Sequence, residues 1–165
     1  MTLNPGSPWY LFAVAISLVL RQQPALAEGK PAHPAMSGAK DCQFAVPEGW
    51  SRFRLKWEGE CADGKAHGKG ALKALEKARV DRIFFGSMEK GELKVGVMDT
   101  TDGFIAGRFE HGRAVDTDDR SIILESFEAA SAAAKAVSDR FNKVGNSASA
   151  RFYDAKAKKL AEQMD

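Results

Sequence analysis

The sequence has no large excess of charge of either sign. Its 165 residues include 24 Lys and Arg against 22 Asp and Glu, which gives a formal net charge of +2. Such a small excess attracts the phosphates of a nucleic acid only weakly, so we expect no nucleic-acid partner. Intrinsic disorder is not expected either, because 44% of the residues are hydrophobic and the charges nearly balance. The length is that of one domain.

Acidic residues are missing from the start of the chain, where none precedes Glu28. An apolar run from Trp9 to Leu20 is followed by Ala25 and Ala27, small residues at the two positions that a signal peptidase requires. The run is shorter than the roughly 20 apolar residues that a spanning helix needs. We therefore predict that residues 1–27 are a cleaved signal peptide, with an uncleaved membrane anchor as the alternative. No cysteine directly follows the run, so a lipid-modified cysteine is not supported.

Cysteine is scarce, because Cys42 and Cys61 are the only two. An exported protein enters an oxidising environment in which disulfides persist, so we expect these two residues to be bonded to each other. In the chain-entropy estimate, a bond that closes a loop of this length stabilises the fold by about 3 kcal/mol. The alternative is two free thiols with a metal or redox role, but the sequence has no CxxC spacing and no further ligands for them.

The composition divides the rest of the chain. Residues 28–40 contain proline, glycine and small side chains without apolar periodicity, and we expect a flexible lead-in there. Apolar and charged residues then alternate from Arg52 to Cys61, which predicts a half-buried strand. The following sequence, Ala62-Asp63-Gly64-Lys65, favours a turn, so the strand should fold back as a hairpin.

A pattern of large residues and glycines occurs three times between Trp57 and Gly112. In each copy, two large residues and the glycine between them share one face of a strand, and a second glycine three positions later makes a turn. We expect the middle glycine to leave room above the sheet for bulky side chains of adjacent hairpins. The copies are Trp57-x-Gly59-x-Cys61-x-x-Gly64, Phe84-x-Gly86-x-Met88-x-x-Gly91 and Ile105-x-Gly107-x-Phe109-x-x-Gly112.

The first copy resembles a MORN (membrane occupation and recognition nexus) repeat. The resemblance covers the segment Trp57–Leu72 and includes the turn glycine Gly64 and the later glycines Gly68 and Gly70. The second and third copies keep fewer of these positions. The resemblance implies a meander of antiparallel β-hairpins over residues 41–119. It implies membrane or protein attachment as the usual role, and it carries no enzymatic signature.

The last part of the chain is rich in alanine. Its apolar residues recur at three- and four-residue steps, which predicts an amphipathic helix from about Arg120 to Lys143. Gly145 ends this helix, and Ser147 or Ser149 can cap a second one. We expect an α+β domain in which the helical hairpin of residues 120–165 covers the sheet. In this packing Ile123, Phe127, Val137 and Phe141 lie on the sheet face that carries Leu55, Trp57, Phe84 and Phe109.

Motifs of known catalytic chemistry are absent. The chain has no GxSxG elbow, phosphate-binding loop or dinucleotide fingerprint. The histidines His33, His67 and His111 lack the spacing of metal ligands, and we expect His67 to make a local hydrogen bond. The acidic residues that could form a site stand in turn and helix-start sequences: Asp99, Asp102, Asp116, Asp118 and Asp119. We assign no catalytic, cofactor-binding or metal-binding residue.

These observations favour an exported, non-catalytic binding or scaffolding module of the bacterial cell envelope, periplasmic or secreted. We expect a protein of the envelope as partner, contacted through the MORN-like sheet, with a lipid or a glycan as the alternative. One rival function is a hydrolase of envelope polymer or lipid that uses acids of the turns between Asp99 and Asp119. Another is peripheral membrane association through Lys156, Lys158 and Lys159. No sequence feature specifies an oligomeric state.

Overall fold

The alternation of apolar and polar residues between Arg54 and Ala114 produces a meander of strands. The computed structural model describes residues 34–165, which belong to one compact unit, Pro31–Asp165. Each strand of the meander pairs antiparallel with the next, so the predicted α+β fold is confirmed. The strands are β3 (Arg54–Ala62), β4 (Lys65–Glu76), β5 (Arg79–Glu89), β6 (Glu92–Thr100), β7 (Gly103–Glu110) and β8 (Arg113–Ala114).

Four turns of the meander contain two residues, and in each turn both residues have a positive φ, between 47° and 83°. This conformation matches the right-handed twist of the flanking strands. In three of the four turns the second residue is the turn glycine of a repeat copy, so the repeat provides the residue type that this conformation favours. The turns are Asp63–Gly64, Lys77–Ala78, Lys90–Gly91 and His111–Gly112.

The first described strand lies where the sequence predicted a flexible lead-in, residues 28–40. β1 (Met36–Ala39) pairs antiparallel with β2 (Cys42–Ala45), which follows the lead-in, so that prediction is wrong over residues 36–39. Backbone pairing needs no apolar periodicity, and small residues allow it, which is why the composition did not reveal the hairpin. The predicted signal peptide, residues 1–27, and the lead-in up to residue 33 lie outside the described residues.

The segment 42–48 runs across three hairpin turns of the meander. Each turn accepts one backbone hydrogen bond from this segment, and each acceptor is the carbonyl of a repeat glycine. The repeat therefore creates a row of acceptors to which the N-terminal segment binds. The three bonds are Gln43 N–H to Gly64 O (2.8 Å), Ala45 N–H to Gly91 O (2.8 Å) and Glu48 N–H to Gly112 O (3.0 Å).

The predicted disulfide is present. Cys42 of β2 is bonded to Cys61 of β3, and their Cα atoms are 5.4 Å apart. Beside this bond, β2 pairs in parallel with the first residue of β4, through Gln43 and Lys65. The covalent bond and the pairing together join the N-terminal segment to the first hairpin of the meander.

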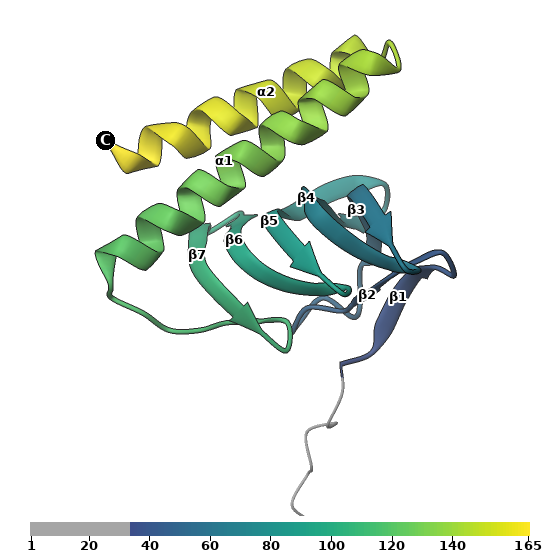
Figure 1. Ribbon diagram of the computed structural model, residues 1–165, viewed down its shortest axis with the longest axis horizontal. Helices are drawn as coiled ribbons and strands as arrows, with labels where there is room; N and C mark the ends of the chain where they lie inside the picture. Colours follow the sequence, from purple (N-terminus) through teal and green to yellow (C-terminus); the bar gives the residue numbers. More distant parts are fainter. Residues whose placement is uncertain (1–33) are drawn as a thin grey trace, which may run out of the picture. The chain divides into compact units, whose positions relative to one another are not determined.

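Two helices follow the sheet, and they lie together on one side of it (Figure 1). α1 (Arg120–Lys143) has the predicted limits and is capped by the side chain of Asp119. α2 (Ser147–Ala161) is capped by Asn146, not by Ser147 or Ser149, and a short 3-10 turn, Glu162–Met164, ends the chain. Among residues 34–165, no helix combines the length and the hydrophobicity that a membrane crossing requires.

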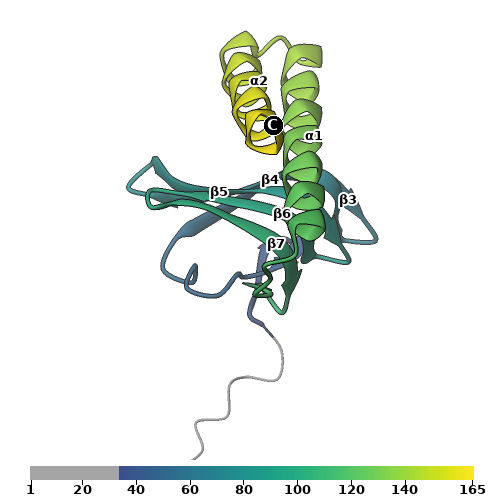
Figure 2. The same cartoon turned by 90° about the vertical axis from the view of Figure 1, so that its left-hand side faces the viewer.

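The sheet is buried on both faces. Figure 2 shows the helices on one face and the N-terminal segment on the other. The helix-side core contains Ile83, Phe85, Val97, Phe127, Ala130, Ala134, Val137, Tyr153, Ala157 and Leu160. The opposite core contains Phe44, Trp50, Phe53, Leu72, Phe84, Met88, Leu93, Met98 and Phe109.

The sequence prediction placed the helices on the wrong face of the sheet. Phe127 and Val137 belong to the core that contains Phe85, whereas Phe84 belongs to the opposite core, together with Trp57. Neighbouring residues of a strand point to opposite faces, and β5 carries large apolar residues on both, so alternation could not decide which face the helices cover. The expected face is filled instead by the segment that precedes β3.

Candidate functional site

A row of glycines crosses the centre of the sheet. Four consecutive strands contribute one glycine each, and neighbours in the row are direct partners in the strand register. Glycine has no Cβ, so the sheet surface is lowest along this row. The row consists of Gly70 on β4, Gly86 on β5, Gly96 on β6 and Gly107 on β7.

Aromatic rings occupy the space above three of these glycines, Gly70, Gly86 and Gly96. A Cβ on Gly70 would come within 2.5 Å of the Trp57 ring, and a Cβ on Gly96 would come within 2.9 Å of the Phe84 ring. Each ring belongs to the same hairpin as the glycines beneath it, not to an adjacent hairpin as the sequence suggested. The repeat residues Phe84 and Phe109 therefore belong to the core opposite the helices and Trp57 packs against it, whereas Ile105 is 47% exposed.

The acidic residues considered as possible acids are dispersed. Asp99 on β6 forms a largely buried ion pair with Lys156 of α2, at 2.5 Å between carboxylate oxygen and Nζ. Asp119 accepts hydrogen bonds from Ser121 as the cap of α1. Within residues 34–165, no three His, Cys, Asp or Glu side chains are grouped so that they could hold a metal ion. Asp99 is thus bound to a lysine, and Asp119 contributes to the start of a helix.

The three lysines near the carboxyl end all contact other side chains of the protein. Lys156 is bound to Asp99, and Lys158 lies 3.0 Å from a carboxylate oxygen of Asp154. The ammonium group of Lys159 lies 5.2 Å from the centre of the Phe104 ring. These contacts join α2 to the sheet or support α2 itself, so they account for the lysines without a membrane surface.

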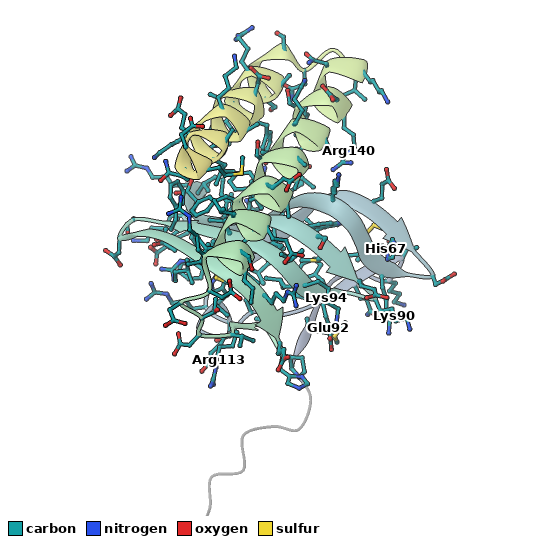
Figure 3. All side chains as sticks on the ribbon, turned by 60° about the vertical axis from the view of Figure 1, so that its left-hand side comes forward. His67, Lys90, Glu92, Lys94, Arg113 and Arg140 are labelled. Carbon is teal, nitrogen blue, oxygen red and sulfur yellow. A yellow bond between two sulfur atoms is a disulfide. The ribbon has the colours of Figure 1, made fainter. Side chains whose placement is uncertain are left out.

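The histidines do not form a site. His67 is exposed on β4, opposite Glu60 of β3, and its ring makes no hydrogen bond with any described residue, so the predicted local bond is wrong (Figure 3). His111 forms the β7–β8 turn together with Gly112 and has a φ of 51° there, the positive value that this turn requires. His33 lies outside the described residues.

A buried polar cluster between β3, β4 and α2 was missed by sequence reasoning. The Glu58 carboxylate lies 2.9 Å from the ammonium groups of both Lys56 and Lys73. Burial alone would raise the pKa of Glu58, but hydrogen bonds and charge from the two lysines outweigh it, so the pKa lies below its usual range. The Tyr153 hydroxyl is buried without a hydrogen-bond partner. Burial first, and then the charge of Glu58, raises the pKa of Tyr153.

The paired charges and the protonated phenol of this cluster indicate a structural role. Its carboxylate is already neutralised by two cations, and its phenol keeps its proton at neutral pH. The Tyr153 ring is stacked on Phe141 at 5.5 Å, so it is held between α1 and the sheet. No sequence signal identified this arrangement, because α2 is far in the chain from the β3–β4 hairpin.

A pocket of about 330 Å³ lies between α1 and β6–β7. Its opposite charges neutralise each other, because Arg108 is bonded to Glu125 at 2.8 Å and Lys94 to Glu92 at 3.3 Å. Figure 3 shows Lys94 and Glu92 beside each other near the end of the β5–β6 hairpin. The residues that line the pocket are Lys94, Val95, Arg108, Phe109, Glu110 and Glu125.

A cationic surface lies at the turn end of the β4–β5 hairpin, near Lys77 and Ala78. The Phe53 ring contacts two guanidinium groups, from Arg52 at 4.6 Å and from Arg82 at 4.9 Å. Lys77 and Arg79 are exposed in the adjoining hairpin turn. We call Arg52, Phe53, Lys77, Arg79 and Arg82 the basic end.

The charges of the basic end are only partly neutralised. Arg82 is bonded to Asp81 at 2.6 Å, but Arg52, Lys77 and Arg79 form no ion pair with any described residue. Val80 beside them is 44% exposed. The basic end thus combines free cations with the exposed side chain of Val80, and the Phe53 ring beneath the two guanidinium groups is buried.

Comparison of the chain with protein-family models, curated proteins and solved structures found no match. Function must therefore be inferred from the geometry of the chain itself. By that criterion the basic end is the strongest candidate among residues 34–165, because the other polar clusters have their charges paired internally.

Proposed function

We propose that the protein is an exported, non-catalytic binding module of the bacterial cell envelope that docks on an acidic surface of a partner protein. The basic end carries this proposal, because Arg52, Lys77 and Arg79 are exposed and without ion pairs beside the Phe53 ring. Arginine is enriched at protein interfaces, and its guanidinium group can bind a carboxylate through two hydrogen bonds.

The proposed compartment is the periplasm or the extracellular space. The apolar run and the small residues before Glu28 favour export, and the Cys42–Cys61 bond is of a kind that persists in an oxidising environment. We include MORN-like character of the three hairpins in the proposal, supported by the equivalent turns at Gly64, Gly91 and Gly112. In this view the hairpins are a scaffold that holds the basic end in place.

The two rival functions have less support. A hydrolase needs polar groups that converge in a cleft, whereas Asp99 is bound to Lys156 and Asp119 caps α1. Peripheral membrane association needs unpaired cations at the helical end, whereas Lys156 and Lys158 are bound to aspartates. A lipid or a glycan as ligand of the basic end is an outcome that the following experiment distinguishes.

Site-specific photocrosslinking in cells tests the proposal. A photoreactive amino acid replaces Val80 in the full-length chain, and the crosslinked products are identified by mass spectrometry. We expect one dominant envelope protein, with a yield that falls about tenfold in the Lys77→Glu/Arg79→Glu variant, because like charges then face the acidic partner. The matched control is Lys65→Glu/Lys90→Glu. It makes the same change of charge at the opposite ends of β4 and β5, beside the β3–β4 and β5–β6 turns.

Each other outcome contradicts part of the proposal. Crosslinks to lipid or glycan would replace the protein partner by that ligand. A protein crosslink that is equally strong in both charge variants would show that the basic end does not select the partner. Absence of any crosslink in an exported and folded protein would remove the basic end as a docking surface.

A further inference from the structure

β3 is the outer strand of the meander. Within residues 34–165 it forms strand pairing with β4 only, so its other edge has no partner along Arg54–Glu58. An unpaired edge presents main-chain N–H and C=O groups to which a further strand can bond. The register with β4 is regular from Arg54 to Glu58 and is interrupted between Glu58 and Glu60.

The contacts of Arg140 show which main-chain groups of β3 face outward. One guanidinium nitrogen of this α1 residue donates to Glu58 O of β3 at 3.0 Å and to Lys69 O of β4 at 2.9 Å. The Glu58 carbonyl therefore points toward β4. Because main-chain groups alternate along a strand, those of Leu55 and Trp57 point to the open edge.

The charges along this edge are arranged symmetrically with opposite signs. On one face of β3, the two residues before Trp57 are basic, Lys56 and Arg54. The two residues after Trp57 on the same face are acidic, Glu58 and Glu60. Contacts of Glu58 with Lys73 and of Glu60 with Arg140 place both acids on the helix side of the sheet. Arg54, Lys56 and Glu60 are exposed.

We propose that β3 pairs antiparallel with β3 of a second copy of this chain, about a two-fold axis at Trp57. Trp57 then lies opposite Trp57 of the second copy, and their outward main-chain groups exchange both hydrogen bonds. Lys56, which lies 2.9 Å from Glu58 of its own chain, then also lies opposite Glu58 of the second copy. The exposed Arg54 lies opposite the exposed Glu60 of the second copy. Each charge pair occurs twice by symmetry, so the interface is self-complementary.

The charge pattern distinguishes this occupant from a merely protected edge. An edge lined by charges of one sign repels its own copy, and proteins use such edges to prevent association. The edge of β3 has the opposite property, because a copy turned by the two-fold axis matches every charge with one of opposite sign. The pairing extends only from Arg54 to Glu60, so we expect a weak, concentration-dependent dimer.

Sedimentation velocity of the full chain at low salt, over a range of concentrations, tests this inference. We expect Lys56→Glu to raise the dissociation constant of the dimer about tenfold, because it places like charges opposite each other twice. Lys90→Glu, the same change on the β5–β6 turn, serves as control and should leave the dissociation constant unchanged. In the wild-type dimer, amide exchange at Leu55 and Trp57 should slow as concentration rises.

A mixing experiment provides a second test that does not depend on loss of association alone. Arg54→Glu and Glu60→Arg chains should each be more monomeric than the wild type, whereas an equal mixture should form a heterodimer with both charge pairs restored. A chain that is monomeric at all concentrations, a dimer unaffected by Lys56→Glu, or a mixture no more associated than its parts would each overturn the inference. None of these outcomes bears on Lys77 and Arg79, so the proposed docking function is tested separately.

Discussion

Three glycines occupy the same position in the three repeat copies, yet their surroundings differ. Gly59 lies beneath the ring of Trp57, a partly exposed residue whose Nε1–H donates a hydrogen bond to Glu60 O at 2.9 Å. Gly86 faces backbone atoms of β6 and the Phe84 ring, neither of which has room to move in the buried core. Gly107 has Val115 O as its nearest neighbour, at 3.4 Å from a Cβ. The same residue in the sequence pattern therefore meets unequal steric demands.

We expect Gly86→Ala to lower the free energy of unfolding by about 3 kcal/mol, because the new methyl group overlaps the Val95 carbonyl. Gly107→Ala is the matched control at the equivalent position, and it should change the free energy by less than about 0.5 kcal/mol. Urea denaturation of the two variants checks this. Equal effects would show that the crowding around Gly86 does not decide the requirement for glycine.

At the scale of elements, the sheet depends on two covers of different origin. On one face the cover is the helical hairpin, which contributes Phe127. On the other face it is the N-terminal segment, whose Trp50 is 2% exposed and which is bonded to three turns and to β3 through Cys42. Neither cover is part of the meander, so each strand surface is buried by residues distant from it in the sequence.

Both covers should therefore contribute comparably to stability. We expect Trp50→Ala and Phe127→Ala each to lower the free energy of unfolding by about 3–5 kcal/mol, the usual loss for a buried aromatic side chain. The control is Phe152→Ala on α2, a ring that is 43% exposed, with an expected loss below about 1 kcal/mol. Denaturant titration of the three variants provides the measurement. An unchanged midpoint for Trp50→Ala would contradict the role of the N-terminal segment as a cover.

At the scale of the whole molecule, the buried cluster of Glu58, Lys73 and Tyr153 couples folding to pH. The pKa of Tyr153 is raised in the folded state, and in the unfolded state it is about 10. The raised pKa contributes stability that is fully present below pH of about 10 and is lost as the pH rises above it, because the unfolded chain can then ionise.

We expect Tyr153→Phe to remove this alkaline loss, and to raise the free energy of unfolding near neutral pH by about 1 kcal/mol, because the hydroxyl is buried without a partner. Denaturant titration at pH 7 and at pH 11 compares the variant with the wild type. In a chain that starts at Glu28, Tyr153 is the sole tyrosine, so absorbance near 295 nm reports its ionisation directly. Tyrosinate absorbance near pH 10 in the folded protein would contradict the raised pKa.

The local elements were predictable because their causes are local. The helical stripe determined the limits of α1, and the repeat glycines marked three of the two-residue turns. The disulfide followed from there being only two cysteines and from the prediction of export. The β1–β2 hairpin was missed, because backbone pairing of small residues leaves no periodic pattern.

The amino-acid sequence by itself determined the α+β class, the hairpin meander, the helical hairpin and the Cys42–Cys61 bond. Only the tertiary structure decided that the helices cover the face of Phe85 and that the N-terminal segment covers the face of Phe84. A strand with large apolar residues on both faces permits either arrangement, and the choice depends on contacts between segments far apart in the chain. The same long-range contacts brought Arg52 and Arg82 onto one ring and left β3 at the edge, where the candidate surfaces lie.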